Sequence, residues 1–156
     1  MIVEATWKDA LEVCLNMRGS DREEVMATRW SDSPYDFAAD CMRAPGSRFT
    51  AIYEGRPVML GGVAMNQPGI GQAWMVGTDE IGKLGVEIAH ASKAIFSRLL
   101  EGHVHRIQAY SIATHQWAHS WLRKIGFVEA ASLKQFGKRG EDFVLFEMLK
   151  ESADVQ

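Results

Sequence analysis

The segment Ala118-His-Ser-Trp-Leu-Arg-Lys-Ile-Gly-Phe127 constrains the fold of this chain more than any other stretch. Its apolar residues recur at helical spacing. Gly126 stands where a helix commonly ends, because glycine adopts the left-handed C-cap conformation without a steric penalty. An apolar run follows the glycine directly, and residues 106–112 form a strand-like run before the helix. The segment therefore predicts a strand, a helix and a second strand in close succession.

The rest of the chain alternates between helical and strand-like periodicity. Thr6 or Trp7 opens a first helix, and Ser20-Asp-Arg-Glu23 is interpreted as a capping box that opens a second. Ser33-Pro34 supplies the serine cap and first-turn proline of a third helix, and a long apolar stripe predicts another that ends near Glu101. Strand-like segments fall at residues 2–3, 49–53, 57–65, 72–76, 106–112, 128–136 and 142–149.

Composition limits the size and class of the protein. A chain of 156 residues, 47% of them hydrophobic, can bury one core, so we expect a single domain over residues 1–150 and a polar tail at 151–156. The net charge of -3 and the scattered basic residues argue against nucleic acid as a partner. No apolar stretch approaches the roughly 20 residues that span a bilayer, and no signal-peptide pattern opens the chain. We expect a soluble protein made in a cytoplasm, with no membrane partner.

The residues that could ligate a metal do not form a convincing set. Cys14 and Cys41 lack the CxxC spacing of a thiolate site, so both are expected to be free core thiols. His115 and His119 share one helical face at i, i+4 spacing, but no third ligand is evident. We interpret them as a partly exposed polar face opposite Trp117 and Trp121, and predict no metal. Two other tryptophans, Trp7 and Trp30, are expected to pack in the core.

The order of elements resembles that of the GCN5-related N-acetyltransferase (GNAT) family. The resemblance rests on the segment from Ala118 to Phe127, which is similar to the family signature Ala-x-x-Leu-Tyr-x-x-x-Gly-Phe, and covers nearly the whole chain. It implies an α/β (α+β) domain with a mixed, mostly antiparallel sheet of about seven strands, flanked by helices. Strands four and five of such a sheet splay apart.

The resemblance also implies acetyl-CoA as the cofactor, held in the splay. The backbone of Trp74, Met75 and Val76 would bind the pantetheine arm, and amides near Gly82 and Gly85 would bind the pyrophosphate. The positive end of a helix dipole and its unpaired amides favour a phosphate there.

The loop that would bind the pyrophosphate departs from the family pattern. The family has Arg or Gln, two residues, Gly, one residue, and Gly or Ala, whereas residues 76–86 read Val-Gly-Thr-Asp-Glu-Ile-Gly-Lys-Leu-Gly-Val. Neither possible register fits. Asp79, Glu80 and Glu87 would also repel a phosphate, and we interpret them as acids that cap the following helix and complement its dipole. These departures count against acetyl-CoA as a bound cofactor.

A second departure lies within the opening segment. The family tyrosine that protonates the departing CoA thiolate corresponds to Leu122, which has no proton to give, and His115 takes the place of the usual asparagine. Loss of a general acid typically costs about 10²- to 10⁴-fold in rate. Tyr110 is our candidate for a substitute acid, and His119 is an alternative.

A narrower resemblance accounts for both departures. The motifs Gly55-Arg-Pro-Val-Met-Leu-Gly-Gly62, Ala73-Trp-Met-Val-Gly-Thr-Asp79 and His119-Ser-Trp-Leu-Arg-Lys-Ile-Gly126 look like those of the small GNAT-like internal virion proteins of short-tailed bacteriophages. That likeness implies a phage protein in the virion or host cytoplasm, with other virion proteins as partners and little or no acetyltransferase activity.

Two hypotheses of different class follow from the sequence. One is a GNAT-fold virion or virion-assembly protein with a degenerate acetyl-CoA motif. The alternative is an active acyl-CoA-dependent N-acetyltransferase acting on a lysine or a small amine. The sequence does not indicate an acyl acceptor or an oligomeric state.

Overall fold

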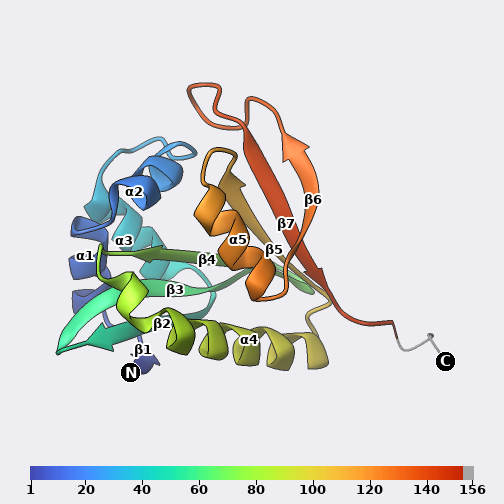
Figure 1. Ribbon diagram of the computed structural model, residues 1–156, viewed down its shortest axis with the longest axis horizontal. Helices are drawn as coiled ribbons and strands as arrows, with labels where there is room; N and C mark the ends of the chain where they lie inside the picture. The colour runs from blue at the N-terminus through green and yellow to red at the C-terminus, as the bar shows by residue number, and fades with distance from the viewer. Residues whose placement is uncertain (153–156) are drawn as a thin grey trace.

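The computed structural model describes residues 1–152 and contains one seven-stranded sheet with helices on both faces (Figure 1). The strand order is β1-β2-β3-β4-β5-β7-β6, and only the central β4–β5 pair is parallel. The strands are β1 (Ile2–Glu4), β2 (Gly46–Tyr53), β3 (Arg56–Gln67), β4 (Ile70–Gly77), β5 (Arg106–Ile112), β6 (Val128–Leu133) and β7 (Phe143–Leu149). This architecture confirms the predicted mixed, mostly antiparallel sheet.

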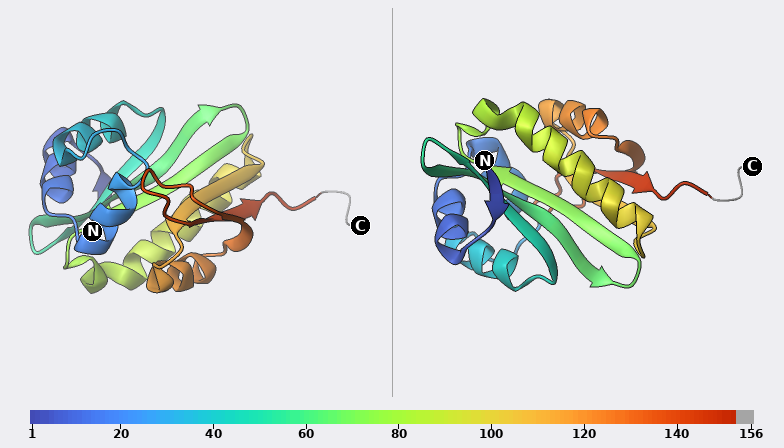
Figure 2. Two further views of the ribbon diagram at one scale, coloured as in Figure 1. Left: turned by 90° about the horizontal axis from the view of Figure 1, so that it is seen from above. Right: turned by 90° about the horizontal axis from the view of Figure 1, so that it is seen from below.

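The helices divide between the two faces of the sheet (Figure 2). Three early helices cover one face, and the long α4 runs across the other, beside α5. Their bounds are α1 (Trp7–Leu15), α2 (Gly19–Met26), α3 (Pro34–Arg43), a short 3-10 helix η1 (Ile81–Leu84), α4 (Gly85–Glu101) and α5 (Gln116–Lys124). No helix within residues 1–152 is both long and apolar enough to cross a membrane.

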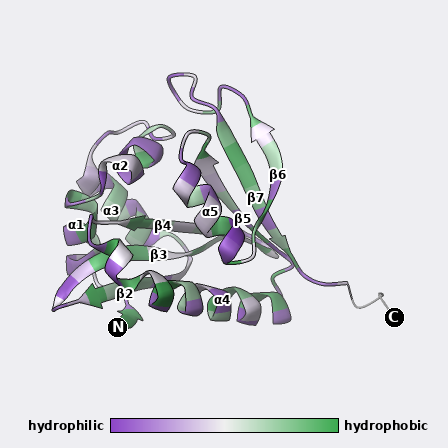
Figure 3. Cartoon of the chain, viewed as in Figure 1, coloured by the Kyte–Doolittle hydropathy of each residue, from purple (hydrophilic) through white to green (hydrophobic). Residues whose placement is uncertain are grey.

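Each face of the sheet has its own apolar core. Side chains of α1 and α3 pack on Leu60 and Val76, whereas α4 and α5 pack on Ile107 and Phe146. Strand β7 is coloured almost wholly hydrophobic in Figure 3 and contributes Phe146 to the core beneath α4 and α5.

Several predicted helix ends are confirmed. The Thr6 side chain accepts from the Asp9 amide in a full capping box, and Ser33 caps α3 with Pro34 in its first turn. Gly126 has φ 110°, the left-handed value expected after α5. A serine hydroxyl and a glycine act on the adjacent turn alone, so the local sequence is enough to place them.

The predicted capping box at Ser20 is wrong. Helix α2 begins one residue earlier, at Gly19, with Arg18 at the cap position and no side-chain cap hydrogen bond. Asp21 lies in the first turn of α2 and bonds to Arg18 and to strand β4. Tertiary contacts therefore override the capping pattern here.

The predicted core thiols are confirmed, since Cys14 and Cys41 are both buried and free. Burial raises the pKa of Cys14 to about 12 and raises that of Cys41 as well. Of the predicted polar tail, residues 153–156 lie outside the described part of the chain.

Strands β4 and β5 diverge, as the family resemblance implied. They pair at three positions only, Ile70 with Arg106, Gly71 with Ile107 and Gln72 with Gln108. Both strands continue for several residues beyond that pairing. The central sheet is therefore open between the carboxyl-terminal halves of β4 and β5.

Candidate active site in the β4–β5 splay

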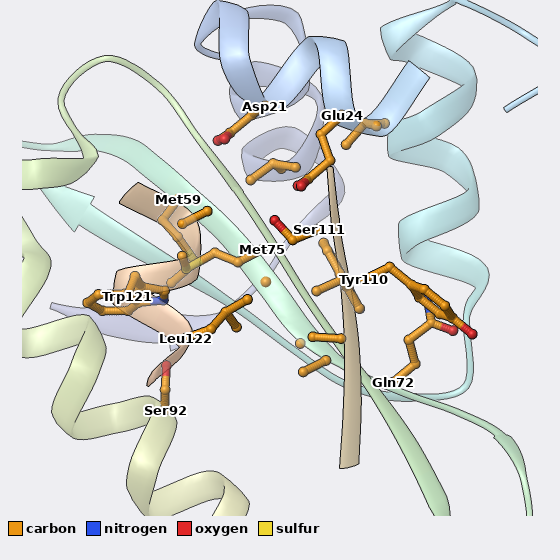
Figure 4. Close-up of a pocket in the computed structure, with 18 of the residues that line it drawn as sticks. Asp21, Glu24, Met59, Gln72, Met75, Ser92, Tyr110, Ser111, Trp121 and Leu122 are labelled. Carbon is orange, nitrogen blue, oxygen red and sulfur yellow. The ribbon is translucent and has the colours of Figure 1, made fainter. Parts of the chain in front are cut away.

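A cavity of about 490 Å³ occupies the opening between β4 and β5. Its wall includes Met75 on β4, Ser111 on β5, Glu24 on α2, Ser92 on α4 and Leu122 on α5 (Figure 4). The cavity is thus lined by helices from both faces of the sheet. A ligand in it would touch both layers of the protein.

Strand alternation leaves main-chain groups free in this cavity. Thr78 donates to Val58 on β3, whereas both main-chain groups of Gly77 are bonded on the opposite side, to α2. Odd-numbered residues of β4 therefore turn their N–H and C=O groups toward β5, and even-numbered ones turn them toward β3. Met75 consequently presents its main-chain groups to the splay with no strand beside it, whereas the Ala73 amide still bonds to β5 at the last paired position.

The same reasoning applies to β5. Its even-numbered residues face β4, because the Arg106 amide donates to Gly69 and the Ile112 amide points to α2. Tyr110 lies between them, beyond the last paired position, so its main-chain groups also face the opening.

Helix α2 spans the mouth of the splay and bonds to the end of each strand. The Asp21 carboxylate accepts from the Gly77 amide at 2.7 Å, and the Glu24 carboxylate accepts from the Ile112 amide at 2.6 Å. Asp21 and Glu24 are three residues apart, so they lie on one face of the helix. One helix face therefore fixes both strand ends.

Asp21 is saturated with partners. It is 4% exposed, and Arg18 donates to it from Nε at 3.1 Å and from Nη2 at 2.9 Å. Burial raises the pKa of the Asp21 carboxyl above its usual range, against the opposing effects of Arg18 and the Gly77 amide. Arg18 in turn lies 4.0 Å over the Trp117 ring, which joins α2 to α5.

Glu24, by contrast, has a sparse set of partners. Besides the Ile112 amide, its Oε1 atom lies 3.6 Å from Nδ1 of His115. His115 is 6% exposed and both of its ring nitrogens lack hydrogen-bond partners, as does the hydroxyl of the buried Ser111. Buried polar atoms are normally bonded, so this cluster has unused hydrogen-bonding capacity.

Four of the predicted site residues line the cavity, namely Trp74, Met75, Val76 and Tyr110. Gly82 and Gly85 do not line it. They belong to the turn at η1 and the start of α4, where the Gly85 amide donates to the Gly82 carbonyl. No side chain caps the start of α4.

Tyr110 and Leu122 lie on opposite sides of strand β5 (Figure 4). The Tyr110 ring stacks on Phe136 at 5.3 Å, and its hydroxyl accepts from the Gln108 side-chain amide at 3.4 Å. Leu122 packs in the other core, against α4 and β5. The candidate acid is therefore in the cavity wall but on the other side of the strand from the leucine that replaces the family tyrosine.

The interpretation of Asp79, Glu80 and Glu87 as helix caps needs correction, because no side chain caps η1 or α4. Both oxygens of Glu80 accept from Arg56, at 2.9 and 2.7 Å, and Glu87 pairs with the N-terminal ammonium at 2.9 Å. Glu87 does lie in the first turn of α4, but neither acid caps it. Because both carboxylates are paired with cations, they repel an incoming phosphate less than their formal charges suggest.

The expected placement of several aromatic and histidine side chains is also wrong. His115 and His119 are buried, and His119 Nε2 donates to the Ile112 carbonyl at 3.0 Å. The helix face that carries Trp117 is the more exposed one, and Trp7 and Trp30 are both exposed rather than part of the core. Helical periodicity defines two faces but does not say which one the sheet covers.

Sequence reasoning missed Glu24 and Ser111 as members of the site. Nothing in the local sequence marks them, since Glu24 lies in an otherwise polar helix. For His115 a signal existed, because it occupies the place of the family asparagine. In residues 1–152 no group of three or more His, Cys, Asp or Glu side chains is placed to hold a metal ion.

Comparison with known proteins decides the fold. No family model matches the sequence, and no curated protein matches it. Solved acetyltransferase structures nevertheless superpose over almost the whole chain. One is the ribosomal-protein-alanine N-acetyltransferase of Brucella melitensis, with a TM-score of 0.72, 19% identity, and 96% of this chain and 99% of that chain covered. The chain has the GNAT fold.

Two acetyltransferases described as GNAT family members superpose similarly on this GNAT-fold chain. The Bacillus anthracis protein has a TM-score of 0.73 and 18% identity, with 97% of this chain and 95% of that chain covered. The Streptococcus pneumoniae protein has a TM-score of 0.66 and 20% identity, with 96% and 98% covered. At these identities the likeness establishes the fold alone.

Proposed function

We propose that this GNAT-fold protein binds an acyl-CoA thioester in the β4–β5 splay and transfers the acyl group to a primary amine. The observation that carries the proposal is the cavity of about 490 Å³ bordered by main-chain groups of Met75 and Tyr110 that lie beyond the last β4–β5 pair. A splay filled by side chains would have no room for a ligand. An open splay with free main-chain groups can bind an extended ligand that carries amide groups of its own.

The pantetheine arm of CoA contains such amides. Laid along β4, it would act as an added strand and exchange hydrogen bonds with the free edge. Of the three residues first proposed for this contact, Met75 has its main chain turned toward the opening. Trp74 and Val76 pair with Gly62 and Leu60 of β3, so their part in the proposal is to hold the strand in place.

In this proposal the start of α4 binds the pyrophosphate of CoA. Its first turn has no side-chain cap, so the positive end of the helix dipole and the amides near Gly82 and Gly85 remain available to an anion, apart from the Gly85 amide, which donates to the Gly82 carbonyl. The ion pairs of Glu80 and Glu87 support this placement, because they offset the negative charge nearby.

The absence of the family tyrosine at Leu122 limits the expected rate but does not prevent the reaction. A thiol has a pKa of about 8.5, so a CoA thiolate can leave without a dedicated acid. We retain Tyr110 as the proposed acid, although its hydroxyl lies across β5 from Leu122. Without an effective acid, turnover should be about 10²- to 10⁴-fold slower than with one.

A virion-associated role is the second candidate. Fully exposed Trp30 and exposed Tyr35 favour it, since aromatic side chains are enriched where proteins meet. In that proposal other virion proteins cover this surface, and the splay has lost its catalytic use.

Isothermal titration with acetyl-CoA separates the two candidates. We expect micromolar binding, and no binding at millimolar acetyl-CoA would overturn the acyltransferase proposal. Met75→Pro removes an amide that faces the splay and has no partner in the sheet ladder, so it should abolish binding while the fold is retained. Met75→Ala keeps the amide and is the matched control, and circular dichroism checks that both variants fold.

A further inference from the structure

The charged side chains around the cavity leave one negative charge without a strong partner. Arg18 pairs with Asp21 at 2.9 Å and Arg29 pairs with Asp40 at 2.6 Å. Glu24 has no Lys or Arg partner in the described part of the chain, and its nearest cationic candidate is His115. The cavity wall formed by α2 therefore carries an uncompensated carboxylate.

Polar side chains that lack partners surround this carboxylate. His115 and Ser111 are both more than nine-tenths buried, line the cavity, and have no hydrogen-bond partner for the ring nitrogens or the hydroxyl. Figure 4 shows Ser111 and Glu24 facing the same space at the mouth of the splay. Burying unpaired polar atoms costs stability, so their retention fits a site completed by a bound polar group.

We infer that Glu24 and His115 receive the acceptor amine as its ammonium ion and remove its proton. This inference rests on the proposed acyl transfer and adds the substrate class and the proton acceptor of that site. Glu24 attracts the cation and orients the ring, because Nδ1 of His115 faces Oε1 of Glu24. In the tautomer with hydrogen on Nδ1, the lone pair of Nε2 is free to accept a proton. His115 is thus the catalytic residue and Glu24 the positioning residue.

His115 takes one proton from the ammonium and releases it to solvent, and the nitrogen lone pair of the neutral amine forms the bond to the thioester carbon. The carbonyl π electrons move to oxygen and return as the carbon–sulfur bond breaks and CoA leaves as its thiolate. The proposed acid Tyr110 protonates the sulfur, and a second nitrogen proton passes through water to restore the Tyr110 hydroxyl. The products are the N-acyl amine, CoA thiol and one released proton.

Two amine probes test this role directly. N-acetyl-lysine amide is a cation at neutral pH and needs a base, whereas methoxyamine is already uncharged and does not. With acetyl-CoA as donor and thiol release as the readout, His115→Gln should lower kcat/KM for the lysine probe by about 10²-fold. Glu24→Gln should lower it by about 10-fold, because it keeps an oxygen for the Ile112 amide but loses the charge.

With methoxyamine, both variants should stay within about 3-fold of the unaltered protein, and the affinity for acetyl-CoA should not change. His115→Ala should regain transfer to the lysine probe when imidazole is added. His103→Gln, at an exposed loop histidine, is the matched control and should leave all rates unchanged.

The possible outcomes separate this inference from the function on which it rests. Equal losses with both probes would assign His115 a structural role and overturn the inference. So would acetyl-CoA binding by the unaltered protein with no transfer to the lysine probe. Failure of acetyl-CoA to bind overturns the proposed function itself, and the inference with it.

Discussion

The ends of strands β4 and β5 both lie at the mouth of the splay, yet they are fixed in different ways. Gly77, the last residue of β4, has both main-chain groups bonded to the start of α2, through the Arg18 amide and the Asp21 carboxylate. Ile112, the last residue of β5, bonds to side chains from two helices, Glu24 of α2 and His119 of α5.

This difference separates structural acids from functional ones. The β4 end is a closed unit in which every polar atom of Asp21 is used and a guanidinium balances its charge. The β5 end leaves Glu24 short of partners and the His115 ring nitrogens without hydrogen bonds. Two carboxylates one helical turn apart thus have different roles, because only one of them has a full set of partners.

Asp21→Ala should produce the largest effect on stability. It leaves the mostly buried Arg18 and the Gly77 amide without their partner, which should cost about 3 kcal/mol in the free energy of unfolding. Urea denaturation measures this cost. Asp79→Ala, at an exposed aspartate, is the control and should stay within about 0.5 kcal/mol. A cost for Asp21→Ala as small as the control would contradict a structural role for this carboxylate.

The pH dependence of stability tests whether burial or Arg18 has the larger effect on the pKa of the same carboxyl group. Because burial raises the pKa of Asp21, the folded protein holds its proton over a pH range in which the unfolded chain has lost it. The stability gained from that proton is full below the unfolded pKa and is lost as pH rises through the folded pKa. The free energy of unfolding of the unaltered protein, relative to that of Asp21→Asn, should therefore increase as pH falls. An advantage that shrinks on acidification would mean that Arg18 outweighs burial.

His119→Phe should have an intermediate effect at the β5 end. Phenylalanine can fill the space beside Phe146, but the Ile112 carbonyl loses one of its two donors and keeps the His115 main-chain amide. Loss of one such hydrogen bond should cost about 1 kcal/mol. Thermal unfolding of this variant against His103→Phe, a loop substitution, measures the cost, and equal midpoints would show that the hydrogen bond contributes nothing.

Glu24→Gln should have the smallest effect on stability, about 0.5 kcal/mol or less, because the glutamine oxygen still accepts from the Ile112 amide. Glu24→Ala removes that acceptor and should cost about 1 kcal/mol more. Urea denaturation of the two variants gives their free energies of unfolding, and the difference separates the contribution of the hydrogen bond from that of the charge. A large loss with glutamine would make Glu24 as structural as Asp21 and would remove the contrast between the strand ends.

Much of the fold could be predicted because its signals are local. The caps at Thr6 and Ser33 and the glycine after α5 act within one turn, and the strand periods distinguish strands from helices. The capping box at Ser20 failed because Arg18, Asp21 and strand β4 form contacts that a local pattern does not contain.

The sequence by itself determined the elements, their order and the splay of two strands that the family resemblance implied. Only the tertiary structure decided which polar residues belong to the site. Glu24 meets the Ile112 amide across 88 residues of chain, and Asp21 meets the Gly77 amide across 56. The tertiary structure also decided which face of α5 is buried, and with it the burial of His115. Local sequence governs the backbone within a turn, whereas the partners and charge of a buried side chain depend on which distant segments pack against it.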